Sequence, residues 1–120
     1  MTRILIIEDE TTIDLETHDA SLIHELDETF DRIYLDALKT IAIRPNIKKD
    51  LKIVLSSQHG TAYPILVNVL EEMGYHVIVV EEQSAYDPDF TNTRSPNPED
   101  LKSYELPLEY AKRHDADLIL

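Results

Sequence analysis

The sequence contains no cysteine and no tryptophan, and it has only two glycines in 120 residues. Without cysteine the chain can form neither a disulfide nor a thiolate metal site, which suits a reducing compartment. Two glycines, Gly60 and Gly74, cannot build the phosphate-binding fingerprints GxGxxG or GxxxxGK(S/T). Nucleotide binding through a glycine-rich loop of either kind is therefore excluded.

Basic residues are scarce as well. The chain has 11 Lys and Arg against 24 Asp and Glu, which gives a formal net charge of −13. A chain this acidic repels phosphate backbones, so we expect no nucleic-acid partner. No apolar run approaches the ~20 residues that cross a bilayer, and the N-terminus lacks the basic start and apolar stretch of a secretory signal. We therefore expect a cytoplasmic protein with no membrane partner.

The clearest secondary-structure pattern lies between residues 51 and 80. "LKIVLS" (51–56) and "HVIVV" (76–80) are short, β-branched runs typical of buried strands. Between them, apolar residues of Leu66–Met73 recur at i, i+3, i+4 and i+7, which predicts a helix. Pro64 suits its first turn and Gly74 the position just past its end. A strand, a helix and a strand in this order predict a parallel sheet and the α/β class.

The N-terminal part is less regular. "ILII" (4–7) reads as a strand, and an apolar spacing of about four residues predicts a helix from about Ser21 to Ile41. "RPNIKKD" (44–50) interrupts the pattern and marks the best candidate boundary. We expect residues 1–45 to be a lead-in of strand plus helix from a preceding region, and 46–120 to be the α/β domain.

The C-terminal part predicts one more helix and one more strand. "NPEDLKSYELPLEYAKRH" (97–114) reads as a helix capped by Asn97, and Pro107 should kink it or split it in two. "DADLIL" (115–120) begins another buried strand. The expected apolar stripe of the helix is Leu101, Tyr104, Leu108 and Ala111. The expected core is Ile53, Val54, Leu55, Leu66, Val69, Leu70, Val77, Ile78, Val79, Leu118 and Ile119.

The opening "MTRILIIEDE" raises one functional alternative, a response-regulator receiver, because acidic residues follow a short strand at Glu8–Glu10. A receiver also needs a phospho-accepting Asp at the end of a later strand. Asp50 is at about the right distance but precedes the strand 51–56, which ends in Ser56 and Ser57. A receiver-like signalling module is therefore the less favoured reading.

Other chemistry-bearing residues have simple structural explanations beside functional ones. His59 in "SSQHGT" (56–61) could act as an acid, a base or a hydrogen-bond donor. A structural role is favoured, in which His59 and Gly60 shape a tight turn packed between secondary-structure elements. Ser56 and Ser57 lack the GxSxG elbow of a hydrolase. Asp14, Glu16 and His18 could share a strand face, although a solvated face explains them better.

The stretch "YDPDFTNTRSPNPED" (86–100) is long, polar and stiffened by three prolines. Long ordered loops in compact domains are usually functional or pack on a neighbour. Asp87 and Asp89 are too few carboxylates for a Ca²⁺ cage. Docking onto another domain is the simpler interpretation.

Five stretches together resemble the second domain of the α-D-phosphohexomutases, the phosphoglucomutase/phosphomannomutase group: "HGT", "GYHVIVVEEQ", "DPDF", "SPNPED" and "DADLIL". The resemblance runs from about Leu51 to Leu120 and extends loosely back to residues 31–41. It implies a three-layer α/β/α sandwich with a largely parallel or mixed sheet. The chain departs from the group's usual pattern at Ser57, where Pro is common, and at Ala62, near which a second Gly is common.

The resemblance also implies a function for a larger parent enzyme of four domains. Such enzymes move a phosphoryl group between the 1- and 6-hydroxyls of a hexose phosphate, through a phosphoserine and a hexose 1,6-bisphosphate. Their Mg²⁺ is held by an Asp-rich loop that follows the strand ending here at Leu120. We therefore expect a chain truncated before that loop, inactive alone, and partnered by other domains of its polypeptide.

No catalytic or metal-binding residue can be carried over from the group to this sequence. Seven positions match the group's motifs, where the resemblance implies a role in shaping the domain and its interdomain contacts. They are His59, Gly60, Ser95, Pro96, Asn97, Pro98 and Glu99.

Overall fold

The computed structural model describes residues 26–120. The strand predicted at 4–7 and the first residues of the predicted N-terminal helix lie outside the described residues. In chain order the helices and strands are α1 (Glu28–Thr40), β1 (Lys52–Leu55), α2 (Ile65–Glu72), β2 (His76–Val79), the 3-10 helices η3 (Glu81–Gln83) and η4 (Leu101–Tyr104), α3 (Glu105–His114) and β3 (Leu118–Ile119).

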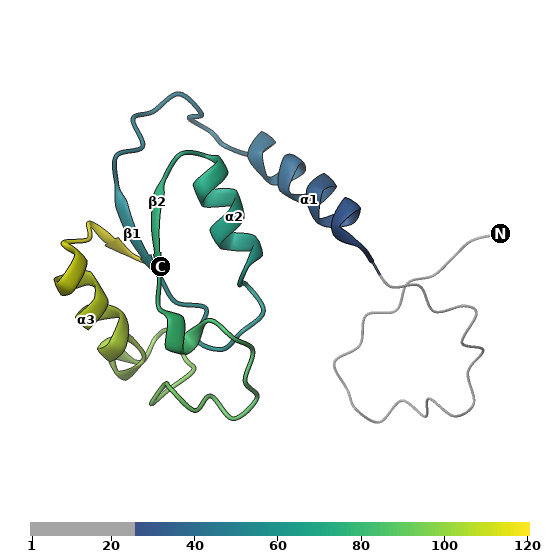
Figure 1. The fold of residues 1–120 in the computed structure, drawn as a ribbon. Helices are drawn as coiled ribbons and strands as arrows, with labels where there is room; N and C mark the ends of the chain where they lie inside the picture. The colour runs from purple at the N-terminus through teal and green to yellow at the C-terminus, as the bar shows by residue number, and fades with distance from the viewer. Residues whose placement is uncertain (1–25) are drawn as a thin grey trace, which may run out of the picture.

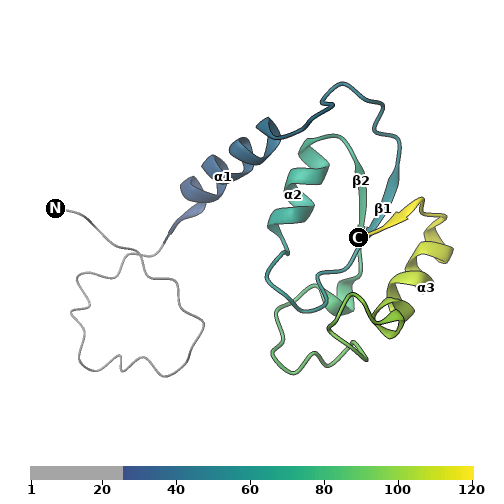
Figure 2. The ribbon, with the colours of Figure 1, turned by 180° about the vertical axis from the view of Figure 1, so that it is seen from behind.

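The described strands form one parallel sheet with β1 at its centre, in the order β2-β1-β3. Val54 pairs with Ile78 of β2 on one side and with Ile119 of β3 on the other. Figures 1 and 2 show α2 and α3 on opposite sides of these strands, with α1 lying outside α2. The predicted α/β/α sandwich and the predicted parallel pairing are both confirmed.

The core is centred on the middle strand. Val54 and Val80 are fully buried and pack with Tyr110 of α3, which is 8% exposed. Ile53, Val54 and Leu55 of β1 are buried because β1 has a strand on each side and helices on both faces of the sheet. The edge strands are less covered, and Leu118 on β3, predicted to be core, is 42% exposed. The core prediction is confirmed for Ile53, Val54, Leu55 and Val69, which are buried. It is wrong for Leu118, and the remaining predicted core residues are half-buried: Leu66, Leu70, Val77, Ile78, Val79 and Ile119.

α2 has the predicted position and the predicted C-terminal stop. Pro64 occupies the N-cap, one residue before the first turn where it was expected. Gly74 has φ of +96°, a conformation that glycine adopts without the cost a Cβ brings, and its N–H donates to the Glu71 carbonyl. The most buried side chains of α2 are Val67 and Val69, so the helix is turned slightly from the predicted stripe.

The single helix predicted over 97–114 is wrong in its first half. Residues 97–100 form a turn, η4 follows, and α3 begins only at Glu105. The cap is Asp100, whose carboxylate accepts from the Lys102 N–H at 3.0 Å, and not Asn97. Pro107 lies in the first turn of α3, where its missing N–H costs no helical bond. α3 runs unbroken through it, and the segment divides before Glu105, so the predicted kink or split at this proline is wrong.

The predicted apolar stripe of this segment is wrong at two of its four positions, whereas Tyr104 and Ala111 are partly buried as expected. Leu101 is 84% exposed and Leu108 is 45% exposed, whereas Ser103, Pro107 and Tyr110 are buried. A 3-10 helix has about 3.0 residues per turn and an α-helix 3.6, so the change of helix type within the segment rotates the inward face.

α1 begins at Glu28, later than the predicted start, because the Asp27 carboxylate caps it by accepting from the Thr29 N–H at 3.0 Å. Leu35 is its one fully buried side chain. Phe30 and Ile33, 47% and 64% exposed, lie on the side of the helix away from Leu35. Within residues 26–120, α1 and every other helix are too short or too polar to cross a membrane.

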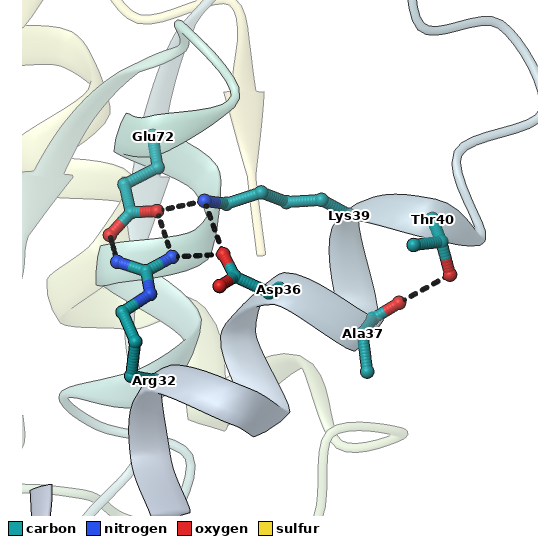
Figure 3. Close-up of polar contacts among 6 residues, drawn as sticks. All are labelled: Arg32, Asp36, Ala37, Lys39, Thr40 and Glu72. Atoms are coloured by element: carbon teal, nitrogen blue, oxygen red, sulfur yellow. Dashed lines mark hydrogen bonds and ion pairs between the residues drawn. The ribbon is translucent and has the colours of Figure 1, made fainter. Parts of the chain in front are cut away.

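Ion pairs join α1 to α2 (Figure 3). Arg32 donates to both carboxylate oxygens of Glu72 at 2.8 Å and to Asp36 at 2.5 Å. Lys39 contacts Glu72 and lies 3.2 Å from Asp36. The hydrogen bonds from Arg32, and then those from Lys39, lower the pKa of Glu72 to about 2. A cluster of four charged side chains, Arg32, Asp36, Lys39 and Glu72, thus links the two helices.

Candidate functional site at the carboxyl end of the sheet

The loops that follow the strands meet at one edge of the sheet. The Ser56 N–H donates to the Leu120 carbonyl at 2.9 Å, and the Val80 N–H donates to the Leu55 carbonyl at the same distance. The carboxyl ends of β1, β2 and β3 are therefore side by side. In parallel α/β sheets ligand sites form at this edge, which makes its polar groups the candidate functional site.

Gln83 is the centre of a hydrogen-bond network at this edge, and it is only 1% exposed. Its side-chain oxygen accepts from the Ser56 hydroxyl at 2.7 Å, and its side-chain nitrogen donates to the Asn92 carbonyl at 2.7 Å. Its main-chain carbonyl accepts from the His59 N–H and from the Ser57 hydroxyl, both at 2.9 Å. One residue of η3 thus ties together the loops after β1 and β2.

Sequence reasoning did not single out Gln83. It lies inside "GYHVIVVEEQ", one of the stretches that carry the family resemblance, so position within that stretch was the available signal. Gln83 follows two glutamates, and nothing in the local sequence pattern indicates that its side chain is buried.

His59 is 3% exposed and lies in the left-handed region, with φ of +63°. Its Nδ1 is 2.9 Å from the Ala85 carbonyl, and its Nε2 is 3.1 Å from the Asn92 main-chain nitrogen. A carbonyl can only accept and an N–H can only donate, so the ring is neutral with its proton on Nδ1. Both nitrogens are occupied by main-chain partners, which leaves neither free for acid–base work on a substrate.

Gly60 closes the turn after β1. Its N–H donates to the Ser57 carbonyl at 2.8 Å, and a Cβ at this position would lie 2.9 Å from that same oxygen. The obstacle is main chain and cannot swing aside, so glycine is the residue that this turn accommodates. The turn is what brings His59 against the next loop.

The loop over 86–94 is held by Asp87. Its carboxylate accepts from the Asp89 N–H and the Thr91 N–H, both at 3.0 Å. The hydrogen bond from the Thr91 side chain, followed by the main-chain bonds, lowers the pKa of Asp87. Asp87 therefore acts as an anchor for its own loop.

The "SPNPE" segment is organised by local bonds. The Ser95 carbonyl accepts from the Thr93 hydroxyl at 2.8 Å, and the Asn97 side chain accepts from the Glu99 N–H at 3.0 Å. The Asn97 carbonyl accepts from the Asp100 N–H at 3.0 Å. The segment is thus a chain of tight turns that leads into η4.

A cavity of about 250 Å³ joins the two motif regions at the carboxyl edge. Gln58 lines it, and the Gln58 side chain donates to the Ser103 carbonyl of η4 at 3.0 Å. His59 does not line this cavity, because its ring is turned to the 85–92 loop. The lining residues are Ser56, Ser57, Gln58, Ala62, Pro96, Pro98, Tyr104, Pro107 and Leu120.

A second, more polar cavity of about 440 Å³ lies between the 82–94 loop and the helices η4 and α3. Arg94 and Lys102 face three glutamates across it, and Arg94 pairs with Glu105 at 3.1 Å. Thr91 and Asn92 form part of its wall. Charges of both signs line it, so its field favours neither an anion nor a cation.

The structure shows no metal site among residues 26–120. No group of three or more Asp, Glu or His side chains in this part of the chain is placed to hold an ion. The described residues thus do not fit the Mg²⁺ that the resemblance implies for the parent enzyme. The candidate cation residues Asp14, Glu16 and His18 lie outside the described residues.

The receiver alternative is not favoured either. Asp50 precedes β1 and pairs with Lys48 on the surface. The carboxyl end of β1, where a receiver has its phospho-accepting Asp, is occupied by Ser56 and Ser57. The acidic residues Glu8–Glu10 lie outside the described part.

A parallel sheet with helices on both faces, and with its loops gathered at the carboxyl edge, defines an α/β/α domain of the open-sheet class. A sequence model of "Phosphoglucomutase/phosphomannomutase, alpha/beta/alpha domain II" matches residues 32–120. The chain belongs to this family and contains its second α/β/α domain. The match begins inside α1, and the boundary predicted near residue 45 stays a prediction.

Curated relatives agree with this assignment. The chain is 42% identical over 112 residues to a phosphomannomutase of Mycoplasmoides pirum, covering 90% of this chain and 21% of that protein. It is 35% identical over 111 residues to a phosphoglucomutase of Staphylococcus epidermidis, covering 88% and 19%. A phosphomannomutase of Mycoplasma genitalium is 33% identical over 112 residues.

The chain spans about a fifth of the length of the curated relatives that it matches. No solved structure matches it significantly.

Proposed function

We propose that this chain serves as the second domain of a cytoplasmic phosphohexomutase. That enzyme would move a phosphoryl group between the 1- and 6-positions of a hexose phosphate, through a phosphoserine and a hexose 1,6-bisphosphate. The observation that carries the proposal is the family match over residues 32–120, supported by relatives named phosphomannomutase and phosphoglucomutase.

The contribution of this domain to the reaction would be structural. The polar groups at its carboxyl edge are occupied by one another: Gln83 by Ser56 and Asn92, and His59 by main-chain groups. Such an edge can present a fixed shape to neighbouring domains, but among residues 26–120 it offers no free nucleophile or general base. His59, Gly60 and Ser95–Glu99 would then shape the domain and its contacts with other domains of the polypeptide.

The phosphoserine and the Mg²⁺ that would neutralise charge on the transferring phosphoryl group would come from other parts of the parent. The 120-residue chain alone would therefore be inactive. This expectation is consistent with its length, about a fifth of the relatives, and with the lack of a metal cluster among residues 26–120.

A domain exchange tests the proposal. The matching segment of the Mycoplasmoides pirum phosphomannomutase is replaced by this chain, and turnover of glucose 1-phosphate and mannose 1-phosphate is measured with and without Mg²⁺. We expect the chimera to retain turnover and the isolated chain to show none. A chimera that folds but is inactive would contradict the assigned role, and enzyme-like turnover by the isolated chain would contradict its purely structural part.

A further inference from the structure

The imidazole of His59 joins two loops that follow different strands. It belongs to the turn after β1, and both of its nitrogen partners belong to the loop after β2. Nδ1 donates to the Ala85 carbonyl at 2.9 Å, while Nε2 accepts from the Asn92 N–H at 3.1 Å. Main-chain bonds run beside them, from the His59 N–H to the Gln83 carbonyl and from the Asp87 N–H to the His59 carbonyl.

These bonds require a neutral ring. If Nε2 gains a proton, it becomes a donor and faces the Asn92 N–H, another donor, across 3.1 Å. The Nδ1 bond to Ala85 survives protonation, because Nδ1 already donates. Protonation therefore removes one specific link, the one to Asn92, and leaves the rest of the turn intact.

The charged groups around the ring come from the two elements packed against it. Glu81 and Glu82 lie on η3, and Asp87 and Asp89 lie on the loop. The Glu82 carboxylate accepts from the Tyr110 hydroxyl at 2.6 Å, and the Asp87 carboxylate accepts from two main-chain N–H groups of its own loop. Neither nitrogen of the ring is bonded to a carboxylate. Asp87 is nonetheless close enough for its charge to interact with that of a protonated His59 ring.

We propose that His59 is a pH-sensitive clamp, whose protonation releases the main chain at Asn92 from the turn after β1. Thr91 and Asn92 form part of the wall of the 440 Å³ cavity. The protonation state of His59 therefore controls how firmly this part of the wall is held in place. The wall is closed while His59 is neutral and loosens in acid. The proposal does not depend on the mutase activity.

The release is local. Asn92 keeps two links that do not titrate: its carbonyl accepts from Gln83 at 2.7 Å, and its side chain donates to the Glu82 carbonyl at 2.8 Å. The Asn92 N–H should therefore become exchangeable while the sheet stays folded. Acid unfolding of the whole domain would behave differently, because the amides of β1 would lose protection at the same time.

NMR of the 120-residue chain tests the clamp in two ways. The nitrogen shifts of the His59 ring should show a protonated Nδ1 and a bare Nε2 at neutral pH. As pH falls through the titration of His59, the protection factor of the Asn92 amide should drop at least tenfold, while those of Val54 and Leu55 hold. A proton on Nε2 at neutral pH, an Asn92 protection that ignores the titration, or a ring that stays neutral until the domain unfolds would each overturn the proposal.

Two variants complete the test. In His59→Asn the shorter side chain tolerates positive φ but cannot reach both loop partners, so the acid-dependent change at Asn92 should vanish. His76→Asn, at the exposed start of β2, is the matched control and should keep the change. A pH dependence that persists in His59→Asn would refute the clamp. If that variant does not fold, the wild-type measurements still decide.

Discussion

Replacing Gln83 by leucine is the most direct perturbation of the carboxyl edge. Leucine has a similar size and is apolar, so it keeps much of the packing and removes the two side-chain hydrogen bonds. The Ser56 hydroxyl loses its acceptor at 2.7 Å, and the Asn92 carbonyl loses its donor at 2.7 Å. Because Gln83 is only 1% exposed, water cannot easily take the place of its amide.

The expected cost follows from those two lost bonds. A buried polar group left without a partner costs about 1–3 kcal/mol, and both bonds are only partly buried, so the low end of the range applies to each. The free energy of unfolding should therefore fall by about 2–3 kcal/mol. For a domain of this size such a loss lowers the melting temperature by roughly 10 °C or more.

Urea unfolding followed by circular dichroism measures this loss, since the chain has no tryptophan to report it. Ser56→Ala combined with Gln83→Leu forms a double-mutant cycle that isolates the bond between them, with an expected coupling of about 0.5–1.5 kcal/mol. Glu81→Leu on the exposed side of η3 is the control and should stay within about 0.5 kcal/mol of wild type. A Gln83→Leu variant as stable as that control, or a coupling of zero, would refute the network as a source of stability.

Three further outcomes are expected. Gly60→Ala should lower the free energy of unfolding by about 1–3 kcal/mol in urea titrations, because the new Cβ would lie 2.9 Å from the Ser57 carbonyl oxygen. An unchanged urea midpoint of unfolding would contradict this expectation and show that the turn relaxes. Tyr110→Phe should let the pKa of Glu82, which the phenol hydroxyl holds low, rise toward its ordinary value, as carbon-detected NMR would record. The pKa of Glu72 is lowered to about 2, so the ionised Glu72 carboxylate stabilises the fold above about pH 4.5, and this stabilisation is lost as pH falls toward 2. Amide exchange in α1 should accelerate over that pH window in the wild type. It should not do so in Glu72→Gln.

The part of the fold that the sequence predicted well is the part where local pattern and burial agree. β1, α2 and β2 each carry an uninterrupted signal, and α2 ends just before Gly74, whose positive φ suits glycine. The parallel pairing then follows from chain order alone, because two strands joined by a helix on one face can hardly pair otherwise. The family resemblance drew partly on this segment, through "HGT" and "GYHVIVVEEQ", and partly on the later loops and the last strand.

The region from Asn97 to His114 shows why pattern fails where helix types mix. Asn97, Pro98 and Asp100 each suit a helix start, and sequence alone gives no reason to choose the third. A 3-10 turn inserted before α3 changes the phase, so Leu101 points to solvent and Ser103 is buried. A loop far away in the sequence contacts this segment, because the side chain of Gln58, 45 residues earlier, donates to the Ser103 carbonyl. A local sequence pattern cannot predict such a contact.

The carboxyl edge was hardest to predict because its polar residues are buried, and burial of a polar side chain has no local signature. For His59 the sequence favours a packed tight turn over a catalytic role, and it does not single out Gln83; both are less than 4% exposed and bonded mainly to loop main chain. A buried polar group is tolerated only when its partners are fixed, so each of these residues constrains two loops at once. On the function proposed above, "HG" and "SPNPE" would specify a shape at the edge of the sheet and would supply no catalytic group. A substitution that breaks one bond there should disturb the neighbouring loop before it disturbs the sheet.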